Sequence, residues 1–498
     1  MSESNPVPRT MTSRRLLLQY VLAAGGVAAV GATPAAARQA SEQPNIILIL
    51  TDDMRADDLA YMPAVQSLLV DQGATLTNFL ATNPSCAPAR ASILRGQYAH
   101  NHGVMRSKGD IGGIEQFVND GDDQSTIATW LQDAGMRNAL IGKYINGYGE
   151  TGNLDVIPPG WSDWAAITSE GYSRFTINEQ GKLVRYKTRD DQEAYSTDAL
   201  ARLASSFIAD AAQAGDPFFL MITPRAPHGP AEPANRHRNA LADAALPQTP
   251  AMNEADVSDK PNWIAVLPRL TAADLAEMEA YNRTRLQTLL AVDEMVAGLV
   301  ADLEQAGVLE TTYILFSSDN GYALGDHRIM REKGSAYSES SLLPMVVRGP
   351  GIAPGSTLDV LASQADLAPT FAEWAGASAP DFVDGRSLAS ILAGNPVPAD
   401  WRQVALIEHA ESGNVSGHKP TWAALRGMEF LYTIYNTDEQ ELYDLRVDPF
   451  QVENLAATTD TALLAALADR TQRMQTCQAA TCRAIESEPL PPNLWPAS

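Results

Sequence analysis

Short apolar runs alternate with helical stretches along this sequence, and the alternation limits the fold more than any other feature. Residues 45–50 read Asn-Ile-Ile-Leu-Ile-Leu, which is typical of a strand buried on both faces of a parallel sheet. Similar runs occupy residues 138–142, 218–223 and 313–316, each after a stretch with helical periodicity. The pattern predicts an α/β fold in which the carboxyl ends of the parallel strands meet at one edge.

Polar side chains follow each apolar run. They are Asp52 with Asp53, Lys143, His228, and Asp319 with Asn320. Each has a simple explanation by itself, such as a turn or a helix cap. Because the strand ends should converge, we expect these side chains to meet where open α/β sheets bind ligands. Neighbouring carboxylates repel each other, so a shared cation would explain the acidic pair.

Cys86, one of only three cysteines, lies in the segment Ser-Cys-Ala-Pro-Ala-Arg at residues 85–90. Pro88 favours the first turn of a helix, which predicts residue 86 at a helix N-terminus, where free N–H groups suit an anion. Arg90 lies one turn further on and can reach the same anion. A lone cysteine is more often a small buried hydrophobe. The segment alone leaves both interpretations open.

The first forty residues have the features of an export signal. Arg14 and Arg15 precede an apolar run at residues 16–30, residues 35–37 are alanines suited to cleavage, and the whole resembles a twin-arginine leader. The run is shorter than the roughly 20 residues that span a bilayer. We predict export to the periplasm, the cell surface or the medium, with no stable membrane insertion after cleavage.

Charge and cysteine content narrow the functional classes. The formal net charge is −24, with 36 basic and 60 acidic side chains, which argues against nucleic acid and anionic membranes as partners. In an oxidising compartment Cys477 and Cys482, close in sequence, can pair with each other. Cys86 would then be the odd cysteine, which marks it as reactive. His100 and His102 lack a metal-site pattern around them and are expected to be structural.

The sequence pattern changes past about residue 373. Alternating runs at residues 421–426, 430–435 and 441–444 predict an antiparallel sheet, and residues 461–475 predict a helix. The predicted parts are a leader (residues 1–40), a catalytic domain (41–373) and a C-terminal subdomain with a tail (374–498).

The Cys-Ala-Pro-Ala-Arg segment resembles the sulfatase signature C-x-P-x-R, and the polar residues at the strand ends fall in the order of that family. Lys333-Gly334 also fits this order. Residues 142–146 and 253–258 look most like glucosamine-6-sulfatase-like and bacterial arylsulfatase-type members. The resemblance covers essentially the whole mature chain. It implies an alkaline-phosphatase-like fold, a mostly parallel sheet flanked by helices, with a smaller C-terminal subdomain of antiparallel sheet plus helix.

The resemblance also implies a mechanism. Cys86 would be oxidised to formylglycine by a formylglycine-generating enzyme, and one hydroxyl of the hydrated aldehyde would attack sulfur. Calcium, or magnesium, would be bound by Asp52, Asp53, Asp319, Asn320 and residue 86. Lys143, His228 and Lys333 would contact the sulfate and ester oxygens, and Arg90 would orient the diol. The leaving alcohol would be protonated by His228 or Lys333.

One position departs from the family pattern. Many sulfatases carry histidine two residues after the strand-end lysine, and here that residue is Ile145. Either Asn146 takes a substrate-contact role, or another histidine such as His327 is the base of the second step.

The sequence therefore predicts a sulfuric ester hydrolase that acts on an aryl or sugar sulfate. A phosphonate or phosphate ester hydrolase of the same superfold is one alternative, and an inactive exported glycan-binding homologue is another. The acidic surface disfavours tight binding of long polyanionic glycans away from the site. A small sulfate ester, an oligosaccharide end and a sulfated polymer all remain open as substrates.

Overall fold

The computed structural model describes residues 43–150, 156–169, 171–187, 195–414, 417–491 and 494, without the side chains of residues 412–418. The predicted leader lies outside the described residues. Residues 41–498 form one compact unit. No helix among the described residues is both long enough and apolar enough to cross a membrane.

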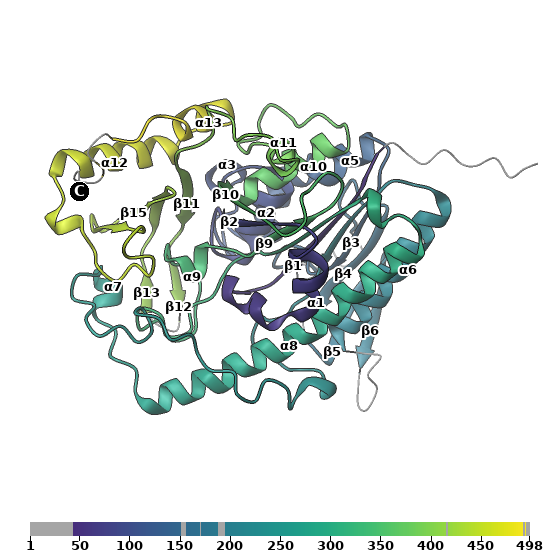
Figure 1. Ribbon diagram of the computed structural model, residues 1–498, viewed down its shortest axis with the longest axis horizontal. Coiled ribbons are helices and arrows are strands. Elements are labelled where there is room, and N and C mark those ends of the chain that lie inside the picture. The colour runs from purple at the N-terminus through teal and green to yellow at the C-terminus, as the bar shows by residue number, and fades with distance from the viewer. Residues whose placement is uncertain are drawn as a thin grey trace, which may run out of the picture. The chain divides into compact units, whose positions relative to one another are not determined.

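A ten-stranded sheet forms the centre of this unit (Figure 1). In spatial order its strands are β10 (Ser356–Ser363), β2 (Ala74–Leu80), β9 (Met345–Arg348), β8 (Thr312–Ser318), β1 (Asn45–Thr51), β7 (Phe218–Thr223), β3 (Arg137–Gly142), β4 (Asp163–Ser169), β5 (Arg174–Glu179) and β6 (Lys182–Lys187). The four central strands β8, β1, β7 and β3 are mutually parallel. They are the four predicted apolar runs, and their carboxyl ends meet at one edge as predicted.

The two ends of the sheet are mixed in direction. β9 runs antiparallel to β2 and β8, whereas β10 is parallel to β2. At the other end β4 is parallel to β3, and β5 and β6 are antiparallel. Strands β4 to β6 were not among the predicted elements. β6 lies at the outermost position and carries Lys182 and Lys187, both exposed. Lysine on an edge strand disfavours pairing with another chain, but it also interrupts the apolar pattern by which a strand is recognised in a sequence.

Helices cover both faces of the sheet (Figure 1). One face carries α2 (Cys86–Arg95), α5 (Ile127–Asp133) and α10 (Leu367–Trp374), and the other carries α6 (Ser196–Ala214) and α8 (Ala272–Gln305). Successive side chains of β1 alternate between the two cores: Leu48 and Leu50 join the first, Ile47 and Ile49 the second. β1 is therefore apolar throughout because both of its faces are covered.

Helical periodicity in the sequence predicts helices at residues 62–72 and 283–305, and the structure differs at both. The segment at residues 62–72 is helical, but α1 (Pro63–Val65) passes into the π-helical segment η2 (Gln66–Val70). α8 begins well before the predicted residue 283, with Thr271 and Asp274 forming a capping box. The first turns of α8 are largely exposed, and only a short apolar stripe of Leu275, Met278 and Tyr281 marks them in the sequence.

The C-terminal subdomain contains the predicted antiparallel sheet and helix. The sheet consists of β11 (Ala405–His409), β14 (Trp422–Arg426), β15 (Phe430–Tyr435) and β16 (Gln440–Asp444), next to the hairpin β12 (Ser412–Asn414) and β13 (Gly417–Lys419) and the helices α12 (Thr461–Met474) and α13 (Ala480–Glu486). Leu388 and Trp401 belong to the core around the central sheet. The domain boundary at residue 373 stays a prediction.

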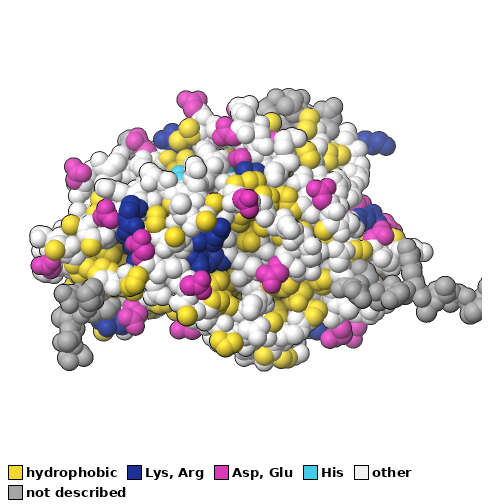
Figure 2. Space-filling view, turned by 90° about the horizontal axis from the view of Figure 1, so that it is seen from above, with side chains coloured by type: hydrophobic (Ala, Val, Ile, Leu, Met, Phe, Trp, Pro, Cys, Tyr) yellow, Lys and Arg dark blue, Asp and Glu magenta, His cyan; other side chains and the backbone are white. Residues whose placement is uncertain are grey.

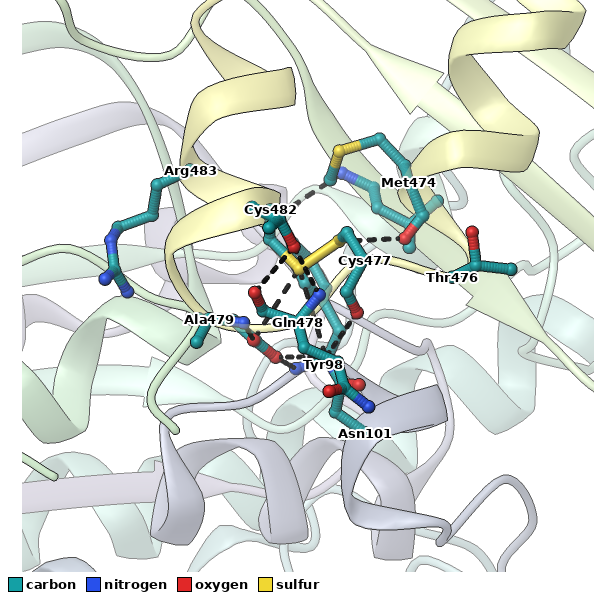
Figure 3. The surroundings of a disulfide bond; sticks show 12 residues. Tyr98, Asn101, Met474, Thr476, Cys477, Gln478, Ala479, Cys482 and Arg483 are labelled. Atoms are coloured by element: carbon teal, nitrogen blue, oxygen red, sulfur yellow. Dashed lines mark hydrogen bonds between the residues drawn. A yellow bond between two sulfur atoms is a disulfide. The ribbon is translucent and has the colours of Figure 1, made fainter. Parts of the chain in front are cut away.

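A disulfide joins Cys477 and Cys482 between α12 and α13, which confirms the predicted pairing. Figure 3 shows Asn101 of α3 (Ala99–His102) beside this bond. The amide of Asn101 donates to the carbonyl oxygen of Cys477 (3.0 Å), and the His100 ring lies 3.0 Å from the same oxygen. The disulfide closes a turn of the chain, and these hydrogen bonds join that turn to α3. Cys86 remains a free, buried cysteine.

Candidate active site

The acidic pair after β1 lies at the predicted edge of the sheet. The Asp52 N–H donates to the carbonyl oxygen of Ala226 (3.1 Å), which joins the end of β1 to the turn after β7. Asp53 has a left-handed backbone with φ 68°, uncommon for a residue other than glycine. Its N–H donates to Oδ1 of Asp319 (3.2 Å) beyond β8. Both side chains of the pair are buried.

Cys86 begins α2, as the proline two residues later predicts. Its Sγ donates to Oδ1 of Asp52 (3.2 Å), and Nζ of Lys333 lies 2.7 Å from the sulfur. Burial raises the pKa of the Cys86 thiol well above its usual value, and the charges of Asp319 and Asp52 add to this effect. A neutral thiol is a weak nucleophile. The unmodified side chain is therefore poorly suited to attack an ester.

Two lysines approach the acidic pair. Lys143 Nζ donates to Oδ2 of Asp52 (2.5 Å), and Lys333 Nζ donates to Oδ1 of Asp53. Burial alone would raise the pKa of Asp52, but Lys143 and then His228 hold it well below its usual value. Burial would also raise the pKa of Asp53, but the charges of Lys333 and His228 lower it below its usual value. Both carboxylates therefore stay ionised at neutral pH.

Asp319 and Asn320 complete the cluster from the end of β8. Arg90 Nε donates to Oδ2 of Asp319 (2.9 Å), and its Nη1 donates to the carbonyl oxygen of Lys143 (2.8 Å). Burial, and next the charge of Asp52, raise the pKa of Asp319. Asn320 Nδ2 donates to Oδ1 of Asp53 (2.6 Å). Among the described residues, the buried Oδ1 of Asn320 has no hydrogen-bond partner.

This cluster fits a divalent cation. Its carboxylate and amide oxygens come from Asp52, Asp53, Asp319 and Asn320, and hard cations prefer such ligands. One ligand atom from each of Asp52, Asp53, Cys86 and His228 lies within 4.8 Å of the other three. A buried polar atom without a partner is costly, so the amide oxygen of Asn320 itself points to a ligand at this place.

His228 lies on the more open side of the cluster, with 28% of its side chain exposed. Its Nε2 is 3.7 Å from Oδ2 of Asp53. Its Nδ1 lies 2.7 Å from the carbonyl oxygen of Gly229, so the proton of the neutral ring belongs on Nδ1. Nε2 then faces the cluster with a free lone pair.

Two predicted residues lie apart from these contacts. Asn146 is half-buried in the turn after β3, and its carbonyl oxygen accepts from the Ile114 N–H (2.8 Å). His327 is fully buried: its Nδ1 is 2.7 Å from Glu254, and its ring stacks on Tyr337 at 4.0 Å. No described contact joins either residue to Cys86. Their roles in substrate contact or as a base stay predictions.

Sequence reasoning missed two side chains that fix the cluster from outside. Arg285 of α8, fully buried, donates from Nη2 to the carbonyl oxygen of Asp53 (2.5 Å). Gln364, which follows β10, donates from Nε2 to the carbonyl oxygen of Asp319 (2.7 Å). Arg285 does have a signal in the sequence, since it adjoins Leu286 on the apolar stripe of a helix, where a charge requires a partner.

Solved structures share this architecture. The protein BT4656, solved with its substrate D-glucosamine-2-N,6-O-disulfate, matches with a TM-score of 0.74 at 24% identity, over 87% of this chain and 98% of that one. The phosphonate monoester hydrolase of Agrobacterium radiobacter matches with a TM-score of 0.68 at 21% identity, over 88% and 96% of the two chains. At these identities the likeness shows the fold, which is the alkaline-phosphatase-like α/β fold.

Sequence comparison narrows this class to a family. Residues 44–377 match the family model described as Sulfatase, and residues 325–478 match the model described as N-sulphoglucosamine sulphohydrolase, C-terminal. The arylsulfatase of Volvox carteri is 32% identical over 94% of this chain and 79% of its own length. The N-acetylglucosamine-6-sulfatase of Homo sapiens is 31% identical over 89% and 86%. The chain belongs to the sulfatase family and is an enzyme of sulfate ester hydrolysis, as predicted.

Proposed function

We propose that this enzyme cleaves sulfate monoesters with a formylglycine made from Cys86 and a bound calcium ion. The proposed ion ligands are Asp52, Asp53, Asp319 and Asn320, with residue 86. The observation that carries the proposal is the surroundings of Cys86: its Sγ bonds Asp52 and lies 2.7 Å from Nζ of Lys333, and Lys143 pairs with the same Asp52. The reacting oxygen would take the place of this sulfur. Magnesium suits the same ligands, and calcium is preferred here from the family resemblance alone.

Formylglycine and a divalent cation would supply chemistry that the unmodified side chains lack. A hydrated formylglycine supplies a hydroxyl nucleophile that can later release sulfate, and a divalent cation supplies charge that offsets the anionic ester. Lys143 and Lys333 flank residue 86 and would neutralise charge that develops on the sulfate oxygens. Arg90 bonds both Asp319 and the backbone of Lys143, so it would hold the two sides of the site at a fixed separation.

Proton transfer is assigned to His228 and Lys333. Because Nδ1 of His228 bonds Gly229, Nε2 is the ring atom that would hold or accept a proton beside Asp53. The protonated ring would donate its proton to the leaving alcohol. Lys333 Nζ, next to Sγ of Cys86, is the other donor within reach of the ester oxygen.

We propose an aryl or sugar sulfate as the substrate. The names of the two relatives support both classes, since one is an arylsulfatase and the other acts on N-acetylglucosamine 6-sulfate by name. The substrate named for BT4656 adds weight to a sulfated amino sugar. We also propose maturation by a formylglycine-generating enzyme and export by the twin-arginine route, and the relative named extracellular sulfatase in Drosophila melanogaster agrees with export.

The test begins with protein produced together with a formylglycine-generating enzyme. Mass spectrometry of the peptide that contains residue 86 should show the aldehyde or its hydrate, and turnover should be faster on an aryl sulfate than on the matching phosphate or phosphonate ester. Cys86→Ala should abolish turnover while the fold is kept. Unmodified cysteine in a fully active preparation would refute the mechanism, and a preference for the phosphonate ester would refute the substrate class.

A further inference from the structure

The loop that carries Lys333 has few backbone contacts of its own. The residue before it is anchored, because Glu332 and Ala323 exchange two backbone hydrogen bonds of 2.7 and 3.2 Å. Within the described part of the chain, the main chain of Lys333 and Gly334 makes no backbone–backbone hydrogen bond. The position of Lys333 therefore depends on side chains that reach its main chain from elsewhere.

Two side chains of the C-terminal subdomain reach this loop. Lys419, the last residue of β13, donates from Nζ to the carbonyl oxygen of Lys333 (2.5 Å). Trp422, the first residue of β14, donates from Nε1 to the carbonyl oxygen of Gly334 (3.1 Å). Gly334 has φ 85°, and a Cβ there would lie 3.1 Å from the His409 ring and 3.2 Å from Nζ of Lys419, so the glycine permits the close approach of both side chains.

Lys419 is held there at an electrostatic cost. The residue is 1% exposed, and its Nζ pairs with Oε1 of Glu332 (2.9 Å) and lies 5.3 Å from the centre of the Trp263 ring. A buried ion pair is usually no more stable than apolar side chains of similar size. Packing alone therefore gives no reason for a lysine here. Besides its pair with Glu332, the ammonium group supplies a hydrogen-bond donor for the carbonyl oxygen of Lys333.

We propose that Lys419 is a positioning residue that sets Lys333 against Cys86 and Asp53, so that the C-terminal subdomain takes part in ester cleavage through one loop. This inference rests on the proposed function, in which Lys333 contacts the sulfate ester. Lys419 itself touches neither Cys86 nor the carboxylate cluster among the described contacts. Displacement of a catalytic group by about 1 Å can cost about a hundredfold in rate, so loss of the donor should lower turnover.

The experiment compares Lys419→Met with a matched control, Arg426→Met. Arg426 is also a buried basic residue of the C-terminal sheet, but it bonds Ser338 and not the loop. Each variant is made with and without Lys333→Ala. The measurements are kcat and KM on a nitrophenyl sulfate and on an alkyl sulfate, together with a crystal structure of Lys419→Met. Trp422→Phe removes the other donor to the loop and replaces Lys419→Met if that variant does not fold.

We expect Lys419→Met to lower kcat at least about tenfold with KM changed less than about threefold, and to slow the alkyl sulfate more than the nitrophenyl sulfate, whose better leaving group needs less help. The effect should vanish in the Lys333→Ala background, and Lys333 should have moved away from Asp53 in the crystal. The proposal would be overturned if the losses in kcat from Lys419→Met and Lys333→Ala multiplied in the double variant. It would also be overturned if the kcat of Lys419→Met were no lower than that of Arg426→Met.

The experiment also separates failure of the proposed function from failure of the role proposed for Lys419. If the parent enzyme cleaves no sulfate ester, the proposed function falls, and the crystal structure alone then decides the role of Lys419. Displacement of Lys333 in Lys419→Met would support the positioning role, and an unmoved Lys333 would refute it.

Discussion

Charge balance at single residues holds the site together. Each of three buried carboxylates meets its own cationic side chain: Asp52 with Lys143, Asp53 with Lys333, and Asp319 with Arg90. An ionised carboxylate left without a partner in the interior costs several kcal/mol. The pairs therefore let the chain bury three acids side by side, and carboxylate oxygens are ligands that hard divalent cations accept.

Arg90→Met should be strongly destabilising. Arg90 and Asp319 are both fully buried, so the change leaves an unpaired carboxylate, and we expect a loss of about 3–5 kcal/mol in the free energy of unfolding by denaturant. The control is Arg137→Met, whose pair with Asp163 is about a quarter exposed on each side (26% and 28%). That variant should lose at most about 1 kcal/mol. Equal losses for the two variants would contradict this account.

Asn320→Leu should weaken cation binding. The substitution removes the amide oxygen that has no hydrogen-bond partner among the described residues, and we expect calcium affinity, measured by calorimetry, to fall at least about tenfold. Asp58→Asn serves as the control. Asp58 is a buried carboxylate of the same segment, but it contacts Arg55 and Arg285 outside the cluster. Unchanged affinity in Asn320→Leu, or an equal loss in Asp58→Asn, would exclude Asn320 as a ligand.

At the level of elements, α3 links the central unit to the C-terminal sheet. His100 of α3 lies 2.9 Å from Oε1 of Glu408 in β11, and its other ring nitrogen faces the carbonyl oxygen of Cys477. Burial alone would lower the pKa of His100, but the charge and hydrogen bond of Glu408 raise it to about 9. The expectation that His100 is structural fits these contacts. His100 is therefore protonated at neutral pH and pairs with Glu408.

This link should weaken as pH rises. The pKa of His100 is raised on folding, so its stabilisation is complete below the ordinary histidine value of about 6.5 and is lost as pH passes about 9. Unfolding of the parent and of His100→Gln at a series of pH values should show a difference on the order of 1–2 kcal/mol that disappears over this interval. His102→Gln is the control, because the pKa of His102 is lowered to about 3 and the ring stays neutral throughout. A constant difference for His100→Gln would refute the linkage.

The strands that the sequence predicts most clearly are those with helices packed on both faces of the sheet. β1 and β7 are continuous apolar runs because helices pack on both faces, so their pattern is strong. The π-helical turn of η2 had no local signal. The N–H groups of Ala64 and Val65 at the start of α1 are capped by Asp293 of α8, at 3.0 and 2.8 Å, and such a distant partner cannot be read from a local window.

At the scale of the whole molecule, acidic side chains outnumber basic ones, 60 to 36. On the face in Figure 2, acidic side chains lie singly among hydrophobic and neutral ones rather than in one patch. The formal net charge of −24 therefore acts as a general field rather than as a local site. At the sheet edge, positive charge that would meet an anionic ester lies on Lys143, which is buried, and on Lys333, whose side chain is 21% exposed.

The net negative charge of the protein should affect KM more for a large anionic substrate than for a small one. A long sulfated polymer is repelled along its length, so its KM should fall as ionic strength rises from about 10 to about 150 mM, where the Debye length shortens to about 8 Å. A small aryl sulfate reaches the local positive charge and should change much less. Steady-state kinetics on both substrates across this range would test the idea. A KM for the polymer that rises with salt would contradict it and would indicate a basic polymer-binding surface.

The sequence by itself determined the central parallel strands, the meeting of their polar ends and the place of Cys86 at the start of a helix. These features are local: apolar runs, turn residues and a proline at fixed spacing encode them. The tertiary structure alone decided which side chains fix that edge, because Arg285 reaches Asp53 from a distant helix and Lys419 reaches Lys333 from another subdomain. Such contacts depend on how separate elements pack, and no local pattern specifies that packing.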